Sequence, residues 1–154
     1  MSRPFIAVLH GVNLDQLGKR DPSHYGSLTL AQLEVQTAAW GDELGFDVGC
    51  FQTNFEGEFV EKLHALRGET AGLILNPGAW THYAYAIHDA LEITSAPAVE
   101  VHLSDVNARD EWRRRSVISP LCFATVSGQG PEGYRTALKL LKDYIAGLSP
   151  EKGS

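Results

Sequence analysis

The sequence predicts an α/β fold, a three-layer sandwich in which a five-stranded parallel sheet lies between two layers of helices. Apolar runs of strand length alternate with segments of helical periodicity, which is typical of βαβ units. The apolar runs show no polar alternation, which indicates strands that are buried on both faces. The length of 154 residues suits one domain that can fold without disulfides.

The expected elements follow one another in a regular order. The expected strands are residues 5–9, 46–51, 71–75, 98–102 and 121–126. The expected helices are residues 30–44, 56–67, 82–93 and 134–148. Thr29 is a suitable N-cap for the first helix and Asn54 for the second, and Gly45 is a suitable helix end. Five strands in a chain of this length predict the flavodoxin-like arrangement, with one domain over residues 1–148 and a frayed tail over 149–154.

Composition excludes several classes of partner. The chain has 13 Lys+Arg against 19 Asp+Glu and a net charge of −6, which disfavours general binding to nucleic acid or anionic membranes. No apolar run approaches the length of about 18 residues that a membrane span needs. The two cysteines, Cys50 and Cys122, lie in apolar runs and form no CxxC motif, which predicts buried free thiols in a reducing cytoplasm.

Polar and cationic residues follow the expected strands at their carboxyl ends. Because right-handed crossovers bring these ends to one edge of a parallel sheet, the residues are expected to meet there. The stretch of residues 10–27 is too long for a routine turn and is expected to be a functional loop. The set includes His10, Asn13, Arg20, Asn76, His82, His102, Arg109 and Arg113, beside the more exposed Arg114 and Arg115. We expect a site for a small anionic ligand at this edge.

The residues after the expected strands do not match the motifs of other activities that are common in related folds. The segment after the first strand lacks the Ser/Thr/Gly-rich phosphate loop of flavodoxins, and Asn76 and Ser127 stand where a receiver domain needs Asp and Lys. Neither a nucleotide-binding glycine motif nor GxSxG occurs. The six histidines show no spacing typical of a metal site. We therefore expect neither a cofactor nor a catalytic metal.

The sequence resembles the type II 3-dehydroquinate dehydratases along nearly its whole length. The matching blocks are LHGVNL (9–14), LGKRDP (17–22), YG (25–26), QTNFEGE (52–58), NPGAWTH (76–82), AIHDAL (86–91), EVHLS (100–104), AR (108–109), EWR (111–113) and GQGPEGY (128–134). Their order and spacing make the combination specific. His10, Val12 and Phe55 depart from the residues usual in the family, which are Asn, Pro and His.

The resemblance implies an anti elimination of water from 3-dehydroquinate, through an enolate and without a Schiff base. By this resemblance Tyr25 is the base, and because a free tyrosine ionises near pH 10 it needs activation, for which Arg20 is the nearby cation. Asn13 supports the enolate. His102 is the general acid, and Glu100, two residues earlier on the same strand face, can hold its protonated imidazole.

The resemblance also implies how the substrate is held. The backbone and hydroxyl at Leu103 and Ser104 bind the substrate carboxylate, with the side chain of Asn76 nearby. His82 and Arg113 bind ring hydroxyls.

Asp89 is expected to act in a neighbouring subunit. It lies seven residues after His82, about two helical turns away from the site that its own chain forms. The resemblance implies a homo-oligomer, a dodecamer built as a tetramer of trimers.

Two questions of function stay open. The chain could be a flavodoxin-like binding protein that has lost catalysis. If it is the enzyme, it could serve either aromatic biosynthesis or quinate breakdown.

Overall fold

The computed structural model describes residues 2–25 and 27–147, with the side chains of His24 and Tyr25 excepted. The tail expected over residues 149–154 lies outside the described residues. Among the described residues, no helix is both long enough and apolar enough to cross a bilayer.

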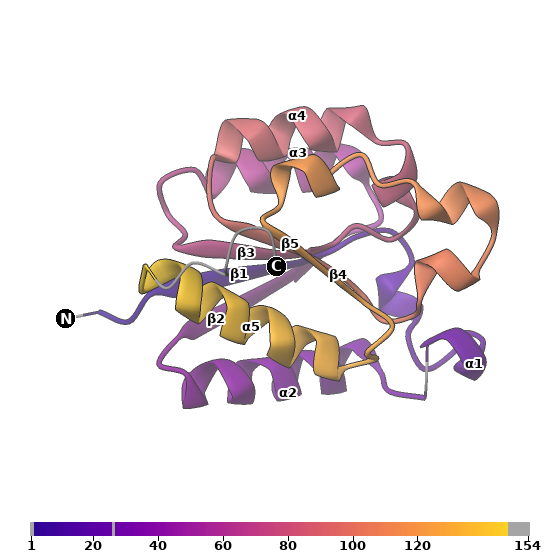
Figure 1. Ribbon diagram of the computed structural model, residues 1–154, viewed down its shortest axis with the longest axis horizontal. Helices are drawn as coiled ribbons and strands as arrows, with labels where there is room; N and C mark the ends of the chain where they lie inside the picture. The colour runs from indigo at the N-terminus through magenta and orange to yellow at the C-terminus, as the bar shows by residue number, and fades with distance from the viewer. Residues whose placement is uncertain (1, 26, 148–154) are drawn as a thin grey trace.

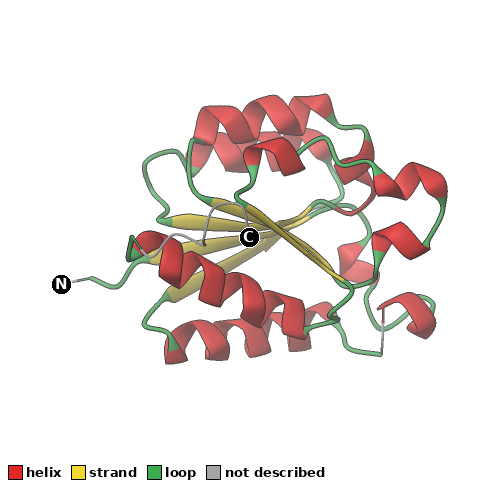
Figure 2. Ribbon diagram, in the orientation of Figure 1, coloured by secondary structure: helices red, strands yellow, loops and turns green. Residues whose placement is uncertain are grey.

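A five-stranded, wholly parallel sheet forms the middle layer, as predicted (Figures 1 and 2). The strand order is β2-β1-β3-β4-β5, the order of flavodoxin-like folds. Every residue of β3 and β4 is buried, whereas the edge strands are partly exposed. The strands are β1 (Phe5–His10), β2 (Asp47–Gln52), β3 (Gly72–Asn76), β4 (Ala98–His102) and β5 (Ala124–Ser127).

Helices cover both faces of the sheet, α2 and α5 on one and α3 and α4 on the other (Figure 1). Each pair packs an apolar cluster against the strands, so each face of the sheet carries its own core. The helices are α1 (Pro22–Tyr25), α2 (Leu30–Glu43), α3 (Glu56–Ala65), α4 (Tyr85–Thr94) and α5 (Glu132–Ile145). Short 3-10 helices are η1 (Leu14–Gln16), η2 (Gly78–His82), η3 (Val106–Ala108), η4 (Glu111–Arg114) and η5 (Ser119–Leu121).

The helix caps match the expectation at one position and differ at another. Thr29 caps α2 as predicted, because its hydroxyl accepts from Gln32 N while the Gln32 side chain accepts from Thr29 N. Asn54 does not cap α3, which is a correction. The N-cap residue there is Phe55, and it makes no side-chain cap hydrogen bond.

Several boundaries differ from the sequence prediction. The fifth strand begins at Ala124 and not at Leu121, because Ser119–Leu121 forms η5 with a proline in its first turn. The helix expected from His82 is divided into η2 and α4, which begins at Tyr85. Arg113 lies on the short 3-10 helix η4.

The topological switch point lies between β1 and β3. His10 pairs with Asn76 at the end of the register, and Gly11 N donates to Asn76 O at 2.8 Å. The loops that leave the two strands approach closely, because a Cβ on Gly11 would lie 2.1 Å from the carbonyl oxygen of Pro77. The fold therefore brings the first and third polar segments into contact at this edge.

Candidate active site

A pocket lies at the carboxyl edge of β1, β3 and β4, beside the switch point. Most residues that the sequence predicted for a site line it, together with several apolar neighbours. The lining residues are Val12, Asn13, Leu14, Arg20, Asn76, Gly78, Ala79, His82, His102, Leu103, Ser104, Val106, Arg109 and Arg113. The position matches the rule that ligands of open α/β sheets bind at the switch point.

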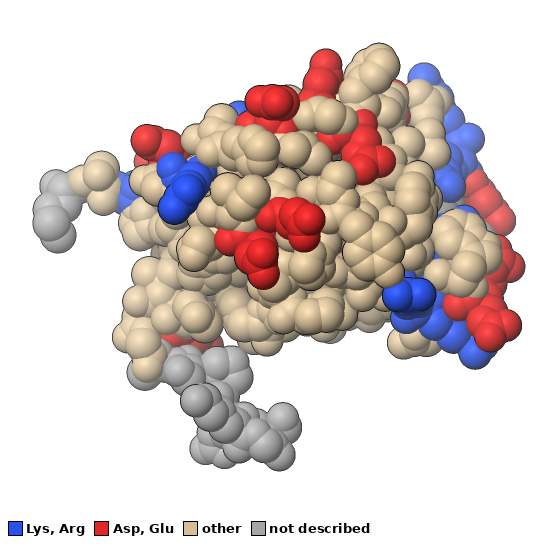
Figure 3. All heavy atoms as spheres, turned by 90° about the horizontal axis from the view of Figure 1, so that it is seen from above, with Lys and Arg blue, Asp and Glu red and all other residues tan. Residues whose placement is uncertain are grey.

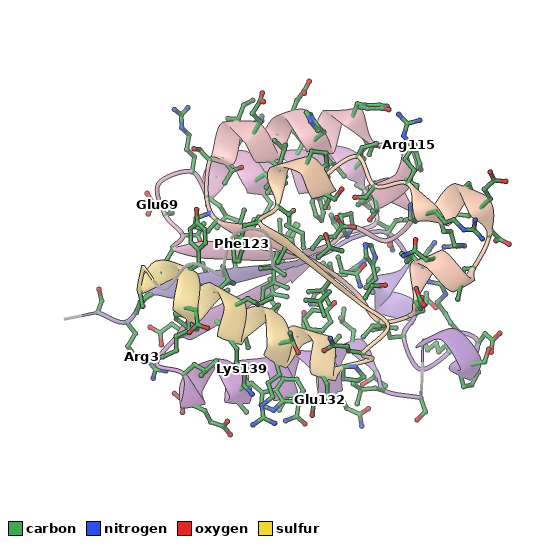
Figure 4. All side chains as sticks on the ribbon, in the orientation of Figure 1. Arg3, Glu69, Arg115, Phe123, Glu132 and Lys139 are labelled. Carbon is green, nitrogen blue, oxygen red and sulfur yellow. The ribbon has the colours of Figure 1, made fainter. Side chains whose placement is uncertain are left out.

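Cationic side chains gather at this end of an otherwise acidic molecule. Figure 3 shows Lys and Arg at the end that carries the loops, with Asp and Glu among them. Arg20, Arg109 and Arg113 line the pocket. Arg115 lies exposed beside this end and donates to Tyr85 Oη at 2.6 Å, whereas Arg3 lies at the opposite end of the sheet (Figure 4). Three arginines around one pocket favour an anionic ligand.

His102 and Glu100 form a buried acid–base pair at the end of β4. The distance from His102 Nε2 to Glu100 Oε2 is 2.5 Å, and both side chains are almost fully buried. The second carboxylate oxygen, Glu100 Oε1, accepts from Ser116 Oγ at 2.8 Å. Because Nε2 is engaged by the carboxylate, Nδ1 is the ring nitrogen available to a ligand in the pocket. This arrangement orients the imidazole ring.

His82 is held in one tautomer by a backbone carbonyl. Its Nδ1 lies 2.6 Å from Arg115 O, so Nδ1 carries the proton and donates it. Burial, opposed by this hydrogen bond and assisted by the nearby His102 and Arg113, lowers the pKa of His82 below its ordinary value of 6.5. The ring is therefore neutral at neutral pH, and Nε2 is left as an acceptor for a ligand hydroxyl.

The lowered pKa of His82 predicts a loss of stability in acid. The unfolded chain takes up a proton near pH 6.5 while the folded chain does not, so the free energy of unfolding falls as the pH decreases below about 6.5. We expect thermal unfolding of the wild type to shift downward between pH 7 and 5.5 by more than that of His82→Asn. Equal shifts in the two proteins would show that His82 does not titrate below its ordinary pKa.

Asn76 is oriented from both sides of its amide. Its Oδ1 accepts from Gly78 N at 3.2 Å, and its Nδ2 donates to Tyr134 Oη at 3.2 Å. Tyr134 is fully buried on α5, and burial raises its pKa, so the phenol stays protonated. Tyr134 was not predicted as a site residue, although it ends the last block of the family resemblance. The contact makes Tyr134 a positioning residue for Asn76.

Asn13 is held in a left-handed backbone conformation by the segment that follows β2. Its φ is 70°, and its N–H donates to Asn54 Oδ1 at 2.8 Å. Gln52 Nε2 in turn donates to Asn54 Oδ1 and to Gly11 O, both at 3.2 Å. Sequence reasoning assigned Asn54 to a helix cap, although its place in a matching block was a signal for the site. Gln52 and Asn54 therefore support the loop that carries Asn13.

Asn54→Ala is expected to lower kcat about fivefold with little change in KM. The substitution removes the acceptor for Asn13 N–H, and one such hydrogen bond is worth about 1 kcal/mol. Steady-state kinetics would test this, with Gln36→Ala, an exposed amide on α2, as the matched control. Unchanged kcat in folded Asn54→Ala would remove Asn54 from the site.

Leu103 and Ser104 form a braced turn after β4. Gly130 N donates to Leu103 O at 3.0 Å, and Gly128 N and Ser127 Oγ both donate to Ser104 O at 3.1 Å. These bonds occupy the carbonyls of the turn. The Ser104 hydroxyl lies in the pocket, 3.5 Å from Arg109 Nη1.

Arg113 is directed by its neighbours on η4. Its guanidinium lies 4.1 Å from the centroid of the Trp112 ring, and Asp110 lies 3.7 Å from Nε. Nε itself is buried and makes no hydrogen bond among the described residues. An aromatic face and a carboxylate thus hold a cation at the rim of the pocket.

Asp89 is absent from the pocket lining, and the Tyr25 side chain lies outside the described part of the chain. Asp89 lies on α4 with 75% of its side chain exposed, and its carboxylate lies 3.0 Å from His88 Nδ1. Tyr25 is the last residue of α1, but its side chain lies outside the described residues. The structure therefore leaves the role of Tyr25 as a prediction and places Asp89 on the surface of its own chain.

The fold and the pocket define a flavodoxin-like α/β protein with an arginine-lined pocket beside a buried Glu100–His102 pair at the carboxyl edge of its sheet. Residues 4–142 match the family described as Dehydroquinase class II. The chain belongs to this family. The family resemblance deduced from the sequence is thereby confirmed.

Similar proteins support the same assignment. The 3-dehydroquinate dehydratase of Pelobacter propionicus is 52% identical over 141 residues, which cover 91% of this chain and 95% of that protein. The 3-dehydroquinate dehydratase of Thermotoga maritima is 44% identical over 144 residues, covering 94% and 99%. The crystal structure of the type II dehydroquinase from Propionibacterium acnes superposes with a TM-score of 0.88 at 40% identity, covering 92% of this chain and 97% of that one.

Proposed function

We propose that the protein dehydrates 3-dehydroquinate to 3-dehydroshikimate by anti elimination through an enolate. The observation that carries the proposal is the buried Glu100–His102 pair beside an arginine-lined pocket, in a chain of the dehydroquinase class II family. The arginines match an anionic substrate, and the pair matches a departing hydroxyl that needs a proton.

The first half of the reaction removes a proton from the carbon next to the ketone. Tyr25 is the proposed base, and Arg20, which lines the pocket, is the cation that favours its phenolate. The electron pair of the broken C–H bond moves toward the ketone oxygen and gives an enolate. Asn13, whose N–H donates to Asn54, is the proposed support for that oxygen through an ordered water.

The second half expels the hydroxyl. The enolate collapses to a conjugated enone as the C–O bond breaks, and His102 supplies the proton that turns the leaving group into water. Glu100 holds the imidazolium before the proton is transferred and keeps the imidazole ring oriented afterwards. No covalent bond to the protein forms, so no lysine is required.

The remaining groups hold the substrate. We assign its carboxylate to the braced turn at Leu103 and Ser104 together with the Asn76 amide. The acceptor Nε2 of His82 and the guanidinium of Arg113 take ring hydroxyls. Because these partners are preoriented by other contacts, little entropy is lost when substrate binds.

The alternative of a binding protein that has lost catalysis finds no support among the similar proteins, which bear the name of the enzyme. The same reaction serves aromatic biosynthesis and quinate breakdown, and the site is compatible with either. The sequence predicted that Cys50 and Cys122 are buried, but both are only half-buried. Both are free thiols, which is the observation behind our proposal of a cytoplasmic location.

The proposal is tested by adding 3-dehydroquinate to the purified protein and following the ultraviolet absorbance of the conjugated product. We expect absorbance to increase in proportion to enzyme, and to do so equally after treatment with borohydride in the presence of substrate. A folded protein that forms no enone would reject the function. Inactivation by borohydride only with substrate present would reject the enolate route in favour of a Schiff base.

Asp89 is proposed to complete the site of a neighbouring subunit within a homo-oligomer, which we propose to be a dodecamer. Its exposed carboxylate on α4 is free to meet a second chain and orient an arginine there. Mixed oligomers of Asp89→Ala and His102→Ala subunits should recover activity above either parent, because some sites regain both residues. Asp143→Ala is the matched control, because Asp143 is also an exposed carboxylate. If activity does not recover after subunit exchange has been demonstrated, Asp89 is only a surface carboxylate.

A further inference from the structure

Three potential metal ligands meet near the carboxyl end of β1, on the sheet face that α2 and α5 cover. His10 ends β1, and Cys50 lies on the adjacent β2 opposite Val8, so the two side chains share one face. Glu34 reaches the same place from α2. One donor atom from each of the three residues lies within 4.8 Å of the other two.

His10 lacks the partners that a buried imidazole requires. Its side chain is 1% exposed, and neither ring nitrogen makes a hydrogen bond among the described residues. Nε2 lies 3.3 Å from Glu34 Oε2, but the two atoms are not aligned for a hydrogen bond. Burying an unpaired polar group costs about 1–3 kcal/mol. The position therefore calls for a further partner between the histidine and the carboxylate.

The separation of the histidine and glutamate atoms matches two ligands of one tetrahedral ion. With bonds of about 2.1 Å to nitrogen and oxygen, a tetrahedral zinc site separates the two ligand atoms by about 3.4 Å. The observed separation of Nε2 and Oε2 is 3.3 Å. Imidazole, carboxylate and thiolate are the three ligand types that zinc takes in proteins.

Solvent can reach the cluster through Glu34. Its side chain is 31% exposed, which leaves a route for an ion to the cluster. The same exposure lets the carboxylate adjust when it moves from a contact with the imidazole to a bond with a metal.

We propose that His10, Glu34 and Cys50 bind one Zn²⁺ ion. On binding, the Cys50 thiol releases its proton to solvent and a sulfur–zinc bond forms, with no change in oxidation state. The ion lies outside the elimination pocket and takes no part in the proton transfers. It braces the end of β1 and, through the His10 ring 5.9 Å from the Tyr134 ring, the tyrosine that holds Asn76.

Metal-free full-length protein titrated with Co²⁺ tests the proposal, because a thiolate bound to cobalt absorbs in the near ultraviolet. We expect a band that saturates at one Co²⁺ per chain and disappears when Zn²⁺ is added. Cys122→Ala is the matched control, since Cys122 is also a free, half-buried thiol, and burial likewise raises its pKa to about 12. The control should keep the band, and Cys50→Ala should lose it.

His10→Asn and the isosteric Glu34→Gln should weaken Co²⁺ binding at least about 100-fold, since losing even a group that only supports a ligand costs 10–100-fold. Zn²⁺ should raise the unfolding temperature of the wild type and of Cys122→Ala but not of Glu34→Gln. A wild type without the band, or a folded Cys50→Ala that keeps it, would overturn the proposal. Turnover by the metal-free enzyme is measured separately, so loss of this site and loss of the proposed function are distinguishable.

Discussion

His102→Ala is expected to lower kcat at least about 100-fold, the usual scale for a positioned acid. The substitution removes the group proposed to deliver a proton to the leaving hydroxyl and leaves Glu100 Oε2 without its partner at 2.5 Å. KM should change less, because the groups assigned to the carboxylate and ring hydroxyls remain. Steady-state kinetics on 3-dehydroquinate measure both constants.

The control for this variant is His64→Ala, an exposed histidine on α3 remote from the pocket lining. It should retain wild-type turnover. Because His102 is buried, thermal unfolding must show that His102→Ala is folded at the assay temperature. Near-normal kcat in that folded protein would remove His102 from the role of acid.

Tyr25→Phe is expected to lower kcat by a similar factor of at least about 100, since it deletes the proposed base while keeping the ring. The same change at Tyr83, an exposed tyrosine outside the pocket lining, should leave kcat unaffected. Arg20→Ala should reproduce part of the loss, mainly in kcat, because Arg20 is proposed to activate the base.

A folded Tyr25→Phe protein with wild-type kcat would show that another group accepts the proton. A raised KM with unchanged kcat in Arg20→Ala would make Arg20 a substrate clamp and not an activator of the base. The two variants together separate proton transfer from binding.

Much of the fold was predictable from local patterns. Unbroken apolar runs correctly located β1, β3 and β4, and the Thr29 cap correctly located the start of α2. The prediction was wrong where a local pattern was overridden by packing. The apolar residues Leu121 and Cys122 resemble the start of a strand, yet they pack against the α3–α4 core before β5 begins at Ala124.

The candidate site was predictable where residues follow strands directly. The Glu100–His102 pair is two residues apart on one strand, so alternation alone places both side chains on one face. Contacts between distant segments were not accessible in this way. The support of Asn13 by Asn54 and of Asn76 by Tyr134 depends on the packing of loops and helices that sequence spacing does not encode.

The cluster of His10, Glu34 and Cys50 is a further case. Its ligands come from β1, α2 and β2, so no short motif marks it, and the histidine spacing gave no metal signal. Only the three-dimensional arrangement brings the donor atoms together.

The central claim is that a base and His102 act on opposite sides of the substrate ring without a covalent intermediate. The most direct test is the mass of product formed from 3-dehydroquinate that carries deuterium at the acidic carbon, on the side opposite the departing hydroxyl. Anti elimination predicts a product that has lost the deuterium. A product that retains it would show removal of the other hydrogen, on the same side as the hydroxyl, and would contradict the account.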